Sequence, residues 1–202
     1  MDFVTMCCPL LHGSGAISTG SRQQADMDKT ITSIDELCSQ LFQHLQGKRH
    51  RIVFAESCTA GLIAGTMGRV PGVSEILTGS AVVYQLATKI AWLGVSTGML
   101  ETFGAVSQEV SEQMARGVLE ITPHANIAAS ISGHLGPGAP PEQDGVAWST
   151  IAIRSAHGVT CTSRQLDLTI RDEPEQDGVT LRRSRQILAV EDVIRFCLEV
   201  VP

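Results

Sequence analysis

The stretch Ile52-Val53-Phe54-Ala55-Glu56-Ser57-Cys58-Thr59-Ala60-Gly61 decides the fold that we expect for this chain. Its apolar first half predicts a short buried strand, and the small and apolar residues 62–67 predict the first turns of a helix. The side chains of Ser57, Cys58 and Thr59 therefore lie where a strand turns into a helix. In open α/β folds ligands bind at the carboxyl ends of strands, and helix N-termini attract anions. The stretch predicts an α/β protein with a nucleophile or a phosphate-binding loop at this turn.

The composition fits one globular domain. The chain has 202 residues, enough to bury a core, and its 43% hydrophobic and 18% charged residues are ordinary values. A net charge of −6 argues against a general nucleic-acid-binding protein. No apolar run approaches the roughly 18–20 residues of a membrane span. We therefore expect neither nucleic acid nor a membrane as a partner.

The cysteines and histidines indicate neither a disulfide framework nor a metal site. The six Cys include no CxxC pair, which suggests reduced thiols, and the six His show no metal-ligand spacing. Residues 1–11 contain the acidic Asp2 and make a poor signal peptide. We expect a cytoplasmic protein with no metal ion and no cofactor.

The first fifth of the chain differs in character from the rest. Residues 13–24 are rich in Gly, Ser and Thr, so we expect 1–32 to be a poorly ordered extension and 33–202 to be one domain. The segment Ser33-Ile34-Asp35-Glu36 is a capping box that begins a helix ending at Gly47.

The order of the remaining elements sets the fold class. The pattern predicts strands over 51–56, 76–84, 126–132, 146–153 and 160–170, and helices over 62–69 and 85–93, after Ser107 and from about Thr180. The helix that Ser107 caps has Val110, Met114, Val118 and Ile121 on one face. Alternating strands and helices followed by adjacent strands predict an α/β/α sandwich with a mixed sheet of about five to six strands.

Three loops follow predicted strands and carry polar or glycine residues in an apolar setting. They span residues 56–61, 84–89 and 132–138. If the three strands are parallel neighbours, these loops converge at one edge of the sheet. We expect the functional site at this edge.

Ser57 is either a nucleophile or the N-cap of the helix that follows it. A serine nucleophile needs a neighbouring base, and the chain has no GxSxG motif. Lys89 is a candidate base if burial lowers its pKa toward neutrality, and otherwise it is a solvated helix residue. Cys58 is either an activated thiol at a helix start or a small buried residue.

Other residues of these loops also have two interpretations. Tyr84 either orients a base or contacts the substrate, or it is a core aromatic at a strand end. Glu56 either bonds a ligand or ties down its own loop. The glycines Gly133, Gly136 and Gly138 either turn backbone N–H groups toward an oxyanion or phosphate, or belong to a plain irregular loop.

A basic cluster of Arg182, Arg183 and Arg185 begins the last helix. Positive charge is mildly unfavourable at a helix N-terminus, whereas guanidinium groups bind phosphate well. The cluster either holds a phosphate or forms a solvated face.

Taken in order, these segments resemble the CinA C-terminal domain family, the nicotinamide mononucleotide deamidases. The matching stretches are Ala55-Glu56-Ser57-Cys58-Thr59-Ala60-Gly61, Val70-Pro71-Gly72-Val73-Ser74, Gly79-Ser80-Ala81-Val82-Val83-Tyr84 with Lys89, Leu93-Gly94-Val95, Phe103-Gly104-Ala105-Val106-Ser107, Ser130-Ile131-Ser132-Gly133 and Gly136-Pro137-Gly138. No single stretch is specific, but the ordered series is, and it extends from about Ser33 to the C-terminus.

The resemblance implies an amidohydrolase that converts nicotinamide mononucleotide and water to nicotinate mononucleotide and ammonia. It implies that Ser57 is the nucleophile, that Lys89 is its base and that Tyr84 helps to orient the lysine or the substrate. The substrate-binding residues that it implies are Glu56, Cys58, Thr59, Ser132, Gly133, Gly136 and Arg182, the last holding the phosphate. We also expect a homodimer or a higher homo-oligomer.

Several positions depart from the family pattern, among them Ala60 in place of a glycine, Leu86 in place of an asparagine and His134 in place of an isoleucine. Leucine cannot make the hydrogen bonds of an asparagine. The departures leave three alternatives, a divergent deamidase, another amidase of this class, or a catalytically weakened paralogue that binds a mononucleotide.

Overall fold

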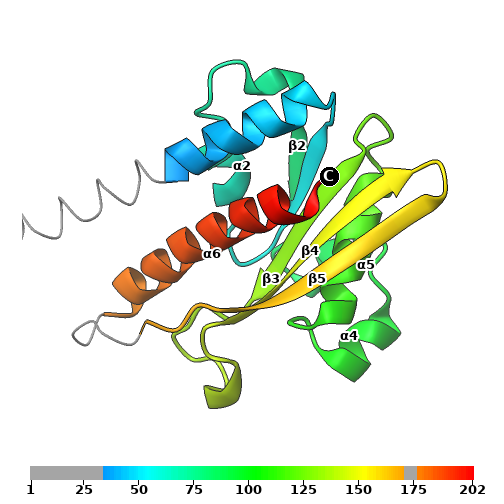
Figure 1. The fold of residues 1–202 in the computed structure, drawn as a ribbon. Helices are drawn as coiled ribbons and strands as arrows, with labels where there is room; N and C mark the ends of the chain where they lie inside the picture. The colour runs from blue at the N-terminus through cyan, green and yellow to red at the C-terminus, as the bar shows by residue number, and fades with distance from the viewer. Residues whose placement is uncertain (1–33, 171–176) are drawn as a thin grey trace, which may run out of the picture. The chain divides into compact units, whose positions relative to one another are not determined.

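A five-stranded mixed sheet forms the centre of the part of the chain that the computed structural model describes, residues 34–170 and 177–202 (Figure 1). The strands are β1 (Ile52–Glu56), β2 (Leu77–Val82), β3 (Ile127–Gly133), β4 (Val146–Ser155) and β5 (Gly158–Asp167), in the spatial order β2-β1-β3-β4-β5. β1 lies between β2 and β3 and is parallel to both, whereas β4 is antiparallel to β3 and to β5.

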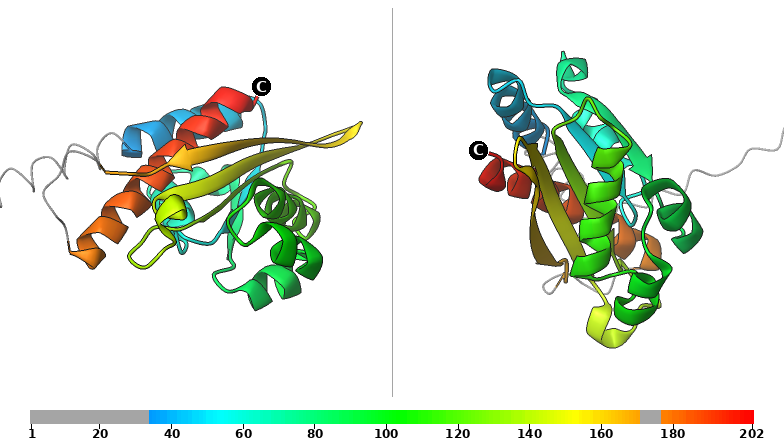
Figure 2. Two further views of the ribbon diagram at one scale, coloured as in Figure 1. Left: turned by 90° about the horizontal axis from the view of Figure 1, so that it is seen from below. Right: turned by 90° about the vertical axis from the view of Figure 1, so that its right-hand side faces the viewer.

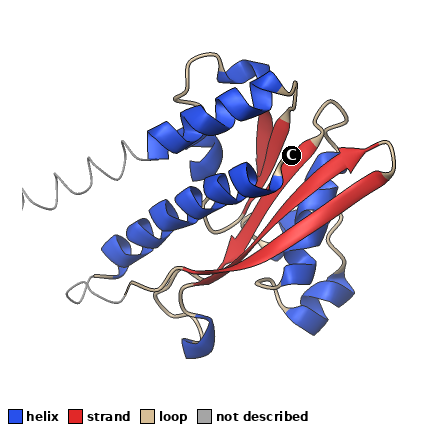
Figure 3. Cartoon of the chain, viewed as in Figure 1, coloured by secondary structure: helices blue, strands red, loops and turns tan. Residues whose placement is uncertain are grey.

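Helices cover both faces of this sheet, which makes the three layers of an α/β/α sandwich (Figures 2 and 3). The helical residues 34–47 lie on one face with α2 (Leu62–Met67) and α6 (Gly178–Val200). α3 (Leu86–Leu93), α4 (Thr97–Phe103) and α5 (Gln108–Glu120) lie on the other face. Short 3₁₀ turns form at Val73–Glu75 and Pro141–Gln143. Among the described residues, no helix is both long enough and apolar enough to cross a membrane.

The central strand β1 supplies side chains to both hydrophobic cores, which explains its unbroken apolar sequence. Phe54 and Ile52 pack into the core under α2 and α6. Val53 and Ala55 pack into the other core, under α3 and α5. Because every residue of β1 is buried, its carboxyl end is a rigid platform for the loop that follows.

The predicted sandwich and mixed sheet are confirmed, with differences at element ends. Ser107 caps α5 as predicted, since its hydroxyl accepts from the Val110 N–H at 3.3 Å. The placement of Ile121 on the buried face of that helix was wrong, because Ile121 follows its last turn and is 59% exposed. β2 ends at Val82, so Tyr84 belongs to the following loop. The extension over 1–32 and the capping residue Ser33 lie outside the described residues.

Candidate active site

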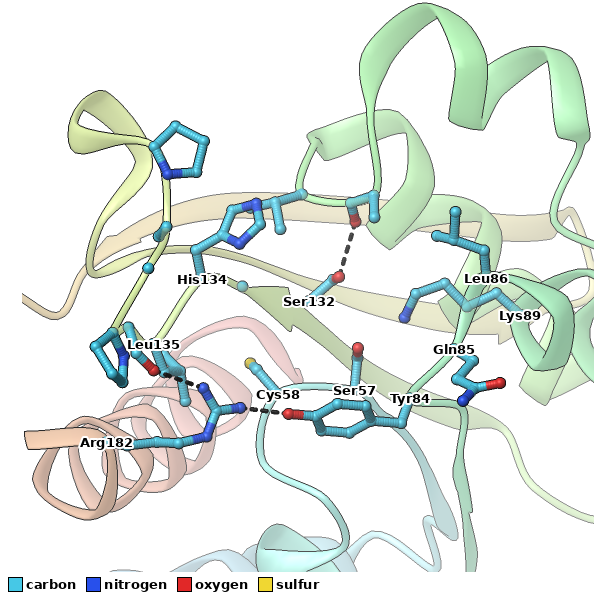
Figure 4. Close-up of a pocket in the computed structure, with 18 residues that line it drawn as sticks. Ser57, Cys58, Tyr84, Gln85, Leu86, Lys89, Ser132, His134, Leu135 and Arg182 are labelled. Atoms are coloured by element: carbon cyan, nitrogen blue, oxygen red, sulfur yellow. Dashed lines mark hydrogen bonds between the residues drawn. The ribbon is translucent and has the colours of Figure 1, made fainter. Parts of the chain in front are cut away.

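The carboxyl ends of β1, β2 and β3 meet at one edge of the sheet, as the sequence predicted. Glu56, at the end of β1, pairs with Val82 of β2 on one side and Ile131 of β3 on the other. A pocket of about 600 Å³ lies at this edge (Figure 4). Its lining comprises Ser57, Cys58, Tyr84, Gln85, Leu86, Lys89, Ala105, Val106, the whole segment 132–140 and Arg182.

Ser57 lies directly after β1 with its hydroxyl pointing into the pocket (Figure 4). Its backbone N–H donates to the Ile131 carbonyl at 3.1 Å, which fixes it against β3. The N-cap interpretation is wrong, because the N-cap of α2 is Gly61 and no side chain caps this helix. In the turn between Ser57 and α2, Ala60 and Gly61 both adopt left-handed backbone conformations, with φ of 53° and 94°. Ser57 as a whole is 8% exposed, and its hydroxyl has no hydrogen-bond partner in the described part of the chain.

Lys89 is a buried cation, 1% exposed, on the first turn of α3. Its Nζ donates to the Val83 carbonyl at 2.9 Å and lies 3.6 Å from the Met114 sulfur, and no carboxylate pairs with it among the described residues. Loss of hydration lowers the pKa of Lys89 from 10.5 to about 8, an effect that a charge on Cys58 would oppose. The solvated-surface interpretation is therefore wrong. Figure 4 shows the amino group and the Ser57 hydroxyl pointing into the same pocket.

Cys58 lines the pocket but lacks the properties of an activated thiol. Its side chain is buried, and burial raises the pKa of the thiol to about 12 despite the nearby Lys89 cation. Since the thiolate is the nucleophilic form, this shift keeps Cys58 in its poorly nucleophilic thiol form at neutral pH. The structure supports the interpretation of Cys58 as a small buried residue. Its own backbone N–H lies close enough to the thiol to lower this pKa slightly, an effect that burial outweighs.

Glu56 and Thr59 are not brought to the pocket lining. The buried Glu56 carboxylate accepts hydrogen bonds from Thr59 Oγ1 at 2.8 Å and from Ile63 N, Ala64 N and Ser80 Oγ at 3.0 Å each. These donors saturate the carboxylate and tie the first turn of α2 to β1 and β2. The geometry supports the interpretation that Glu56 ties down its own loop.

Tyr84 and Arg182 meet across the mouth of the pocket. Tyr84 is 53% exposed, so the interpretation as a core aromatic was wrong. Arg182, from α6, donates through Nη2 to the Tyr84 hydroxyl and through Nη1 to the Gly136 carbonyl at 2.8 Å (Figure 4). One guanidinium thus links the loops that follow β2 and β3.

Arg185, one turn further along α6, fixes the loop between β3 and β4. Its two terminal nitrogens donate to the two carboxylate oxygens of Asp144, each at 2.8 Å, and these bonds lower the pKa of Asp144. A Cβ added to Gly136 would lie 2.8 Å from Arg185 Nη1 and from Asp144 Oδ1. The absence of a side chain at Gly136 therefore lets the loop pass close to this ion pair. For Arg185, 4% exposed, the solvated-face interpretation was wrong, and its pairing with Asp144 was not anticipated.

Ser132 and Gly133 form the wall at the end of β3. The Ser132 hydroxyl donates to the Ala105 carbonyl at 2.7 Å, so its proton is committed while its lone pairs remain free (Figure 4). A Cβ on Gly133 would lie 2.5 Å from Cβ of Ala147, so only glycine fits against β4.

The charge of the pocket is positive. Lys89 and Arg182 contribute to its lining, and no Asp or Glu does so in the described part of the chain. No group of three His, Cys, Asp or Glu side chains within residues 34–170 and 177–202 is arranged to hold a metal ion. The site offers a hydroxyl, a buried amine and a guanidinium.

Sequence comparisons identify the family: residues 34–178 match the CinA C-terminal domain, and the chain belongs to that family. A CinA-like protein of Fervidobacterium nodosum is 37% identical over 142 residues, which are 69% of this chain and 35% of that protein. A CinA-like protein of Chlorobium phaeovibrioides is 47% identical over 94 residues, 46% of this chain and 22% of that protein. The chain thus spans about a third or less of the length of these curated relatives.

Solved structures share the fold. The competence/damage inducible protein CihA from Agrobacterium tumefaciens superposes with a TM-score of 0.71 at 28% identity, over 82% of this chain and 94% of that one. A CinA superfamily protein from Escherichia coli gives a TM-score of 0.73 at 25% identity, over 83% and 90% of the two chains.

Proposed function

We propose that this chain is an amidohydrolase that deamidates nicotinamide mononucleotide, with Ser57 as nucleophile and Lys89 as general base. The observation that carries the proposal is the burial of Lys89, without a carboxylate partner among the described residues, in the same pocket as the Ser57 hydroxyl. A lysine whose pKa is about 8 is neutral in roughly a tenth of the molecules at pH 7, and it can accept a proton there.

The reaction would proceed through an acyl-enzyme. Neutral Lys89 takes the proton of Ser57 as the hydroxyl oxygen attacks the carboxamide carbon. Backbone N–H groups next to the acyl site would donate to the developing oxyanion, and the Lys89 ammonium then protonates the departing ammonia. Water, deprotonated by the same lysine, hydrolyses the ester and releases the nicotinate product.

The other pocket residues fit an anionic nucleotide. Arg182 lies at the mouth, where its guanidinium can exchange its bonds to Tyr84 and Gly136 for bonds to a phosphate. The absence of Asp and Glu from the described lining removes repulsion of a negatively charged substrate.

Release of ammonia from nicotinamide mononucleotide by the purified chain tests the proposal. We expect activity that rises with pH through about 8, as Lys89 loses its proton, and that is abolished in Ser57→Ala. Cys58→Ser is the matched control, because it changes the adjacent residue and should retain turnover. Near-normal turnover by Ser57→Ala, or loss confined to Cys58→Ser, would remove Ser57 from the mechanism.

A second candidate is a mononucleotide-binding module without turnover, and Leu86 favours it. This side chain lines the pocket, is 51% exposed and offers no hydrogen bond to a polar substrate group. Calorimetric binding of nicotinamide mononucleotide without any release of ammonia would establish this alternative.

A further inference from the structure

A second pocket lies at the opposite edge of the sheet from Ser57. It has a volume of about 440 Å³, and we call it the amino-edge pocket. Its lining consists of Gln46, Arg49, His50, Arg51, Glu75, Ile76, His124 and Asn126. Arg51 directly precedes β1 and Asn126 directly precedes β3, so the pocket lies at the amino ends of the parallel strands. The function proposed for Ser57 does not involve this pocket.

Positive and hydrogen-bond-donating side chains dominate the amino-edge pocket. Two arginines and two histidines line it against one carboxylate, in a chain whose net charge is −6. Neither the Arg49 nor the Arg51 guanidinium makes an ion pair or a hydrogen bond, as far as the described chain shows. The carboxylate, Glu75, accepts a hydrogen bond from Gln46 Nε2 at 2.7 Å. Both arginines are exposed, so each guanidinium is free to bind an anion that enters the pocket.

A hydrogen bond with Asn126 orients the His50 ring and leaves its Nε2–H free to donate to a ligand. The Asn126 side-chain oxygen accepts from the Arg51 N–H at 2.7 Å, so its amide nitrogen donates to His50 Nδ1, 2.6 Å away. A ring whose Nδ1 accepts carries its proton on Nε2 when neutral. Burial, with Lys48 and His44 nearby, lowers the pKa of His50, so the neutral Nε2–H form predominates at neutral pH.

Arg49 occupies a backbone position that favours glycine. Its φ is 57°, two residues after the helical residues 34–47, and its N–H donates to the Gln46 carbonyl at 3.0 Å in the turn that ends the helix. Helices often end with a left-handed glycine at such a position, since a side chain is disfavoured there. An unfavourable arginine beside a pocket is explained if its guanidinium binds a ligand.

We propose that the amino-edge pocket binds a small phosphate compound with at least two negative charges, a di- or polyphosphate, through Arg49, Arg51 and His50 Nε2–H. Guanidinium forks match the geometry of phosphate oxygens and bind them through paired hydrogen bonds. Ile76 is the one apolar residue in the described lining, so the pocket recognises the phosphates rather than an attached ring.

Isothermal titration calorimetry of the full chain with inorganic pyrophosphate, at pH 7 and moderate salt, tests this proposal. We expect saturable binding by the wild type, and at the amino-edge pocket an affinity at least about tenfold weaker in the double variant Arg49→Gln/Arg51→Gln. Arg195→Gln is the matched control on the exposed face of α6, and Arg182→Gln removes the guanidinium that would bind phosphate in the Ser57 pocket. Arg195→Gln should bind pyrophosphate within about twofold of the wild type, because Arg195 does not line the amino-edge pocket, and Arg182→Gln should retain one saturable site.

A second variant separates binding from folding. Arg49→Gly relieves the left-handed strain, so we expect the Tm to rise by about 2–4 °C while pyrophosphate binding weakens. A nucleoside diphosphate should bind no more than about threefold more tightly than pyrophosphate if phosphates alone are recognised.

The proposal is overturned by absence of saturable pyrophosphate binding, by full binding in the double variant, or by loss of binding in Arg182→Gln. The last result would place the anion in the Ser57 pocket. Binding of a single-stranded oligonucleotide without binding of pyrophosphate would also overturn it, in favour of nucleic acid.

Discussion

Replacing Lys89 with methionine tests the buried base through the stability of the protein. Burial lowers the pKa of Lys89 from 10.5 to about 8. Since each pKa unit corresponds to about 1.4 kcal/mol, the buried ammonium lowers the free energy of unfolding by about 3 kcal/mol at pH 7. Methionine has a similar length and no charge. Lys89→Met removes the burial of a charge and loses the hydrogen bond to the Val83 carbonyl, at a cost of about 1–2 kcal/mol.

The sign of the pH dependence follows from the direction of the shift. Between about pH 8 and 10.5 the unfolded chain carries the Lys89 proton and the folded chain does not, so raising the pH through this range stabilises the folded wild type. We therefore expect Lys89→Met to be more stable than the wild type at pH 7 and less stable at pH 10.5. The difference in free energy of unfolding should change by about 3 kcal/mol between these values.

Urea unfolding of both proteins across this pH range measures the difference. Lys48→Met is the matched control, because Lys48 is exposed and its replacement should give no such change with pH. Lys89→Met should also release no ammonia at any pH, as should Lys89→Arg, since arginine cannot be deprotonated in proteins. A difference between wild type and Lys89→Met that stays constant from pH 7 to pH 10.5 would refute the reasoning.

Three further substitutions have defined outcomes. Leu86→Asn should raise kcat/KM for nicotinamide mononucleotide about tenfold in the ammonia assay, because it supplies a missing hydrogen-bonding group, and an unchanged value would make Leu86 a packing residue. Asp144→Asn leaves buried Arg185 without its counter-charge, so we expect a loss of about 2 kcal/mol by urea unfolding, less than for a fully buried pair because the Asp144 side chain is 37% exposed. Gly133→Ala should lower the Tm, since its methyl group would lie 2.5 Å from the Ala147 Cβ, and a wild-type Tm would show that β4 can move away.

Local pattern was enough to predict the sandwich and the edge of the sheet that carries the pocket. The unbroken apolar run of β1 required burial on both faces, and parallel neighbours then follow from the helices between the strands. The convergence of the three loops was a consequence of that order. One pocket contains Ser57, Lys89 and Ser132, because these residues lie after β1, in α3 and near the end of β3, elements whose order the pattern predicted.

Burial of individual polar side chains was harder to predict, because it depends on packing between segments far apart in the sequence. Lys89 is covered by α5, which begins about twenty residues later, so its own helix gives no sign of its burial. Arg185 is buried and pairs with a carboxylate 41 positions away. The sequence contains a weak indication that Arg185 faces the loops of the pocket, since it follows Arg182 by three residues and so lies on the same face of α6.

The buried lysine also bears on whether the pocket catalyses or only binds. A module that needs positive charge for a phosphate is served by an exposed lysine or by Arg182, both of which remain charged at neutral pH. Burying Lys89 destabilises the folded chain and leaves its amine partly neutral at pH 7. A neutral amine is a poorer anion ligand and a better base, so this placement weakens binding and favours proton transfer. Leu86, by contrast, changes the exposed rim of the pocket and leaves Ser57 and Lys89 in place. The two features together favour an amidohydrolase with altered substrate contacts over a binding module that has lost its chemistry.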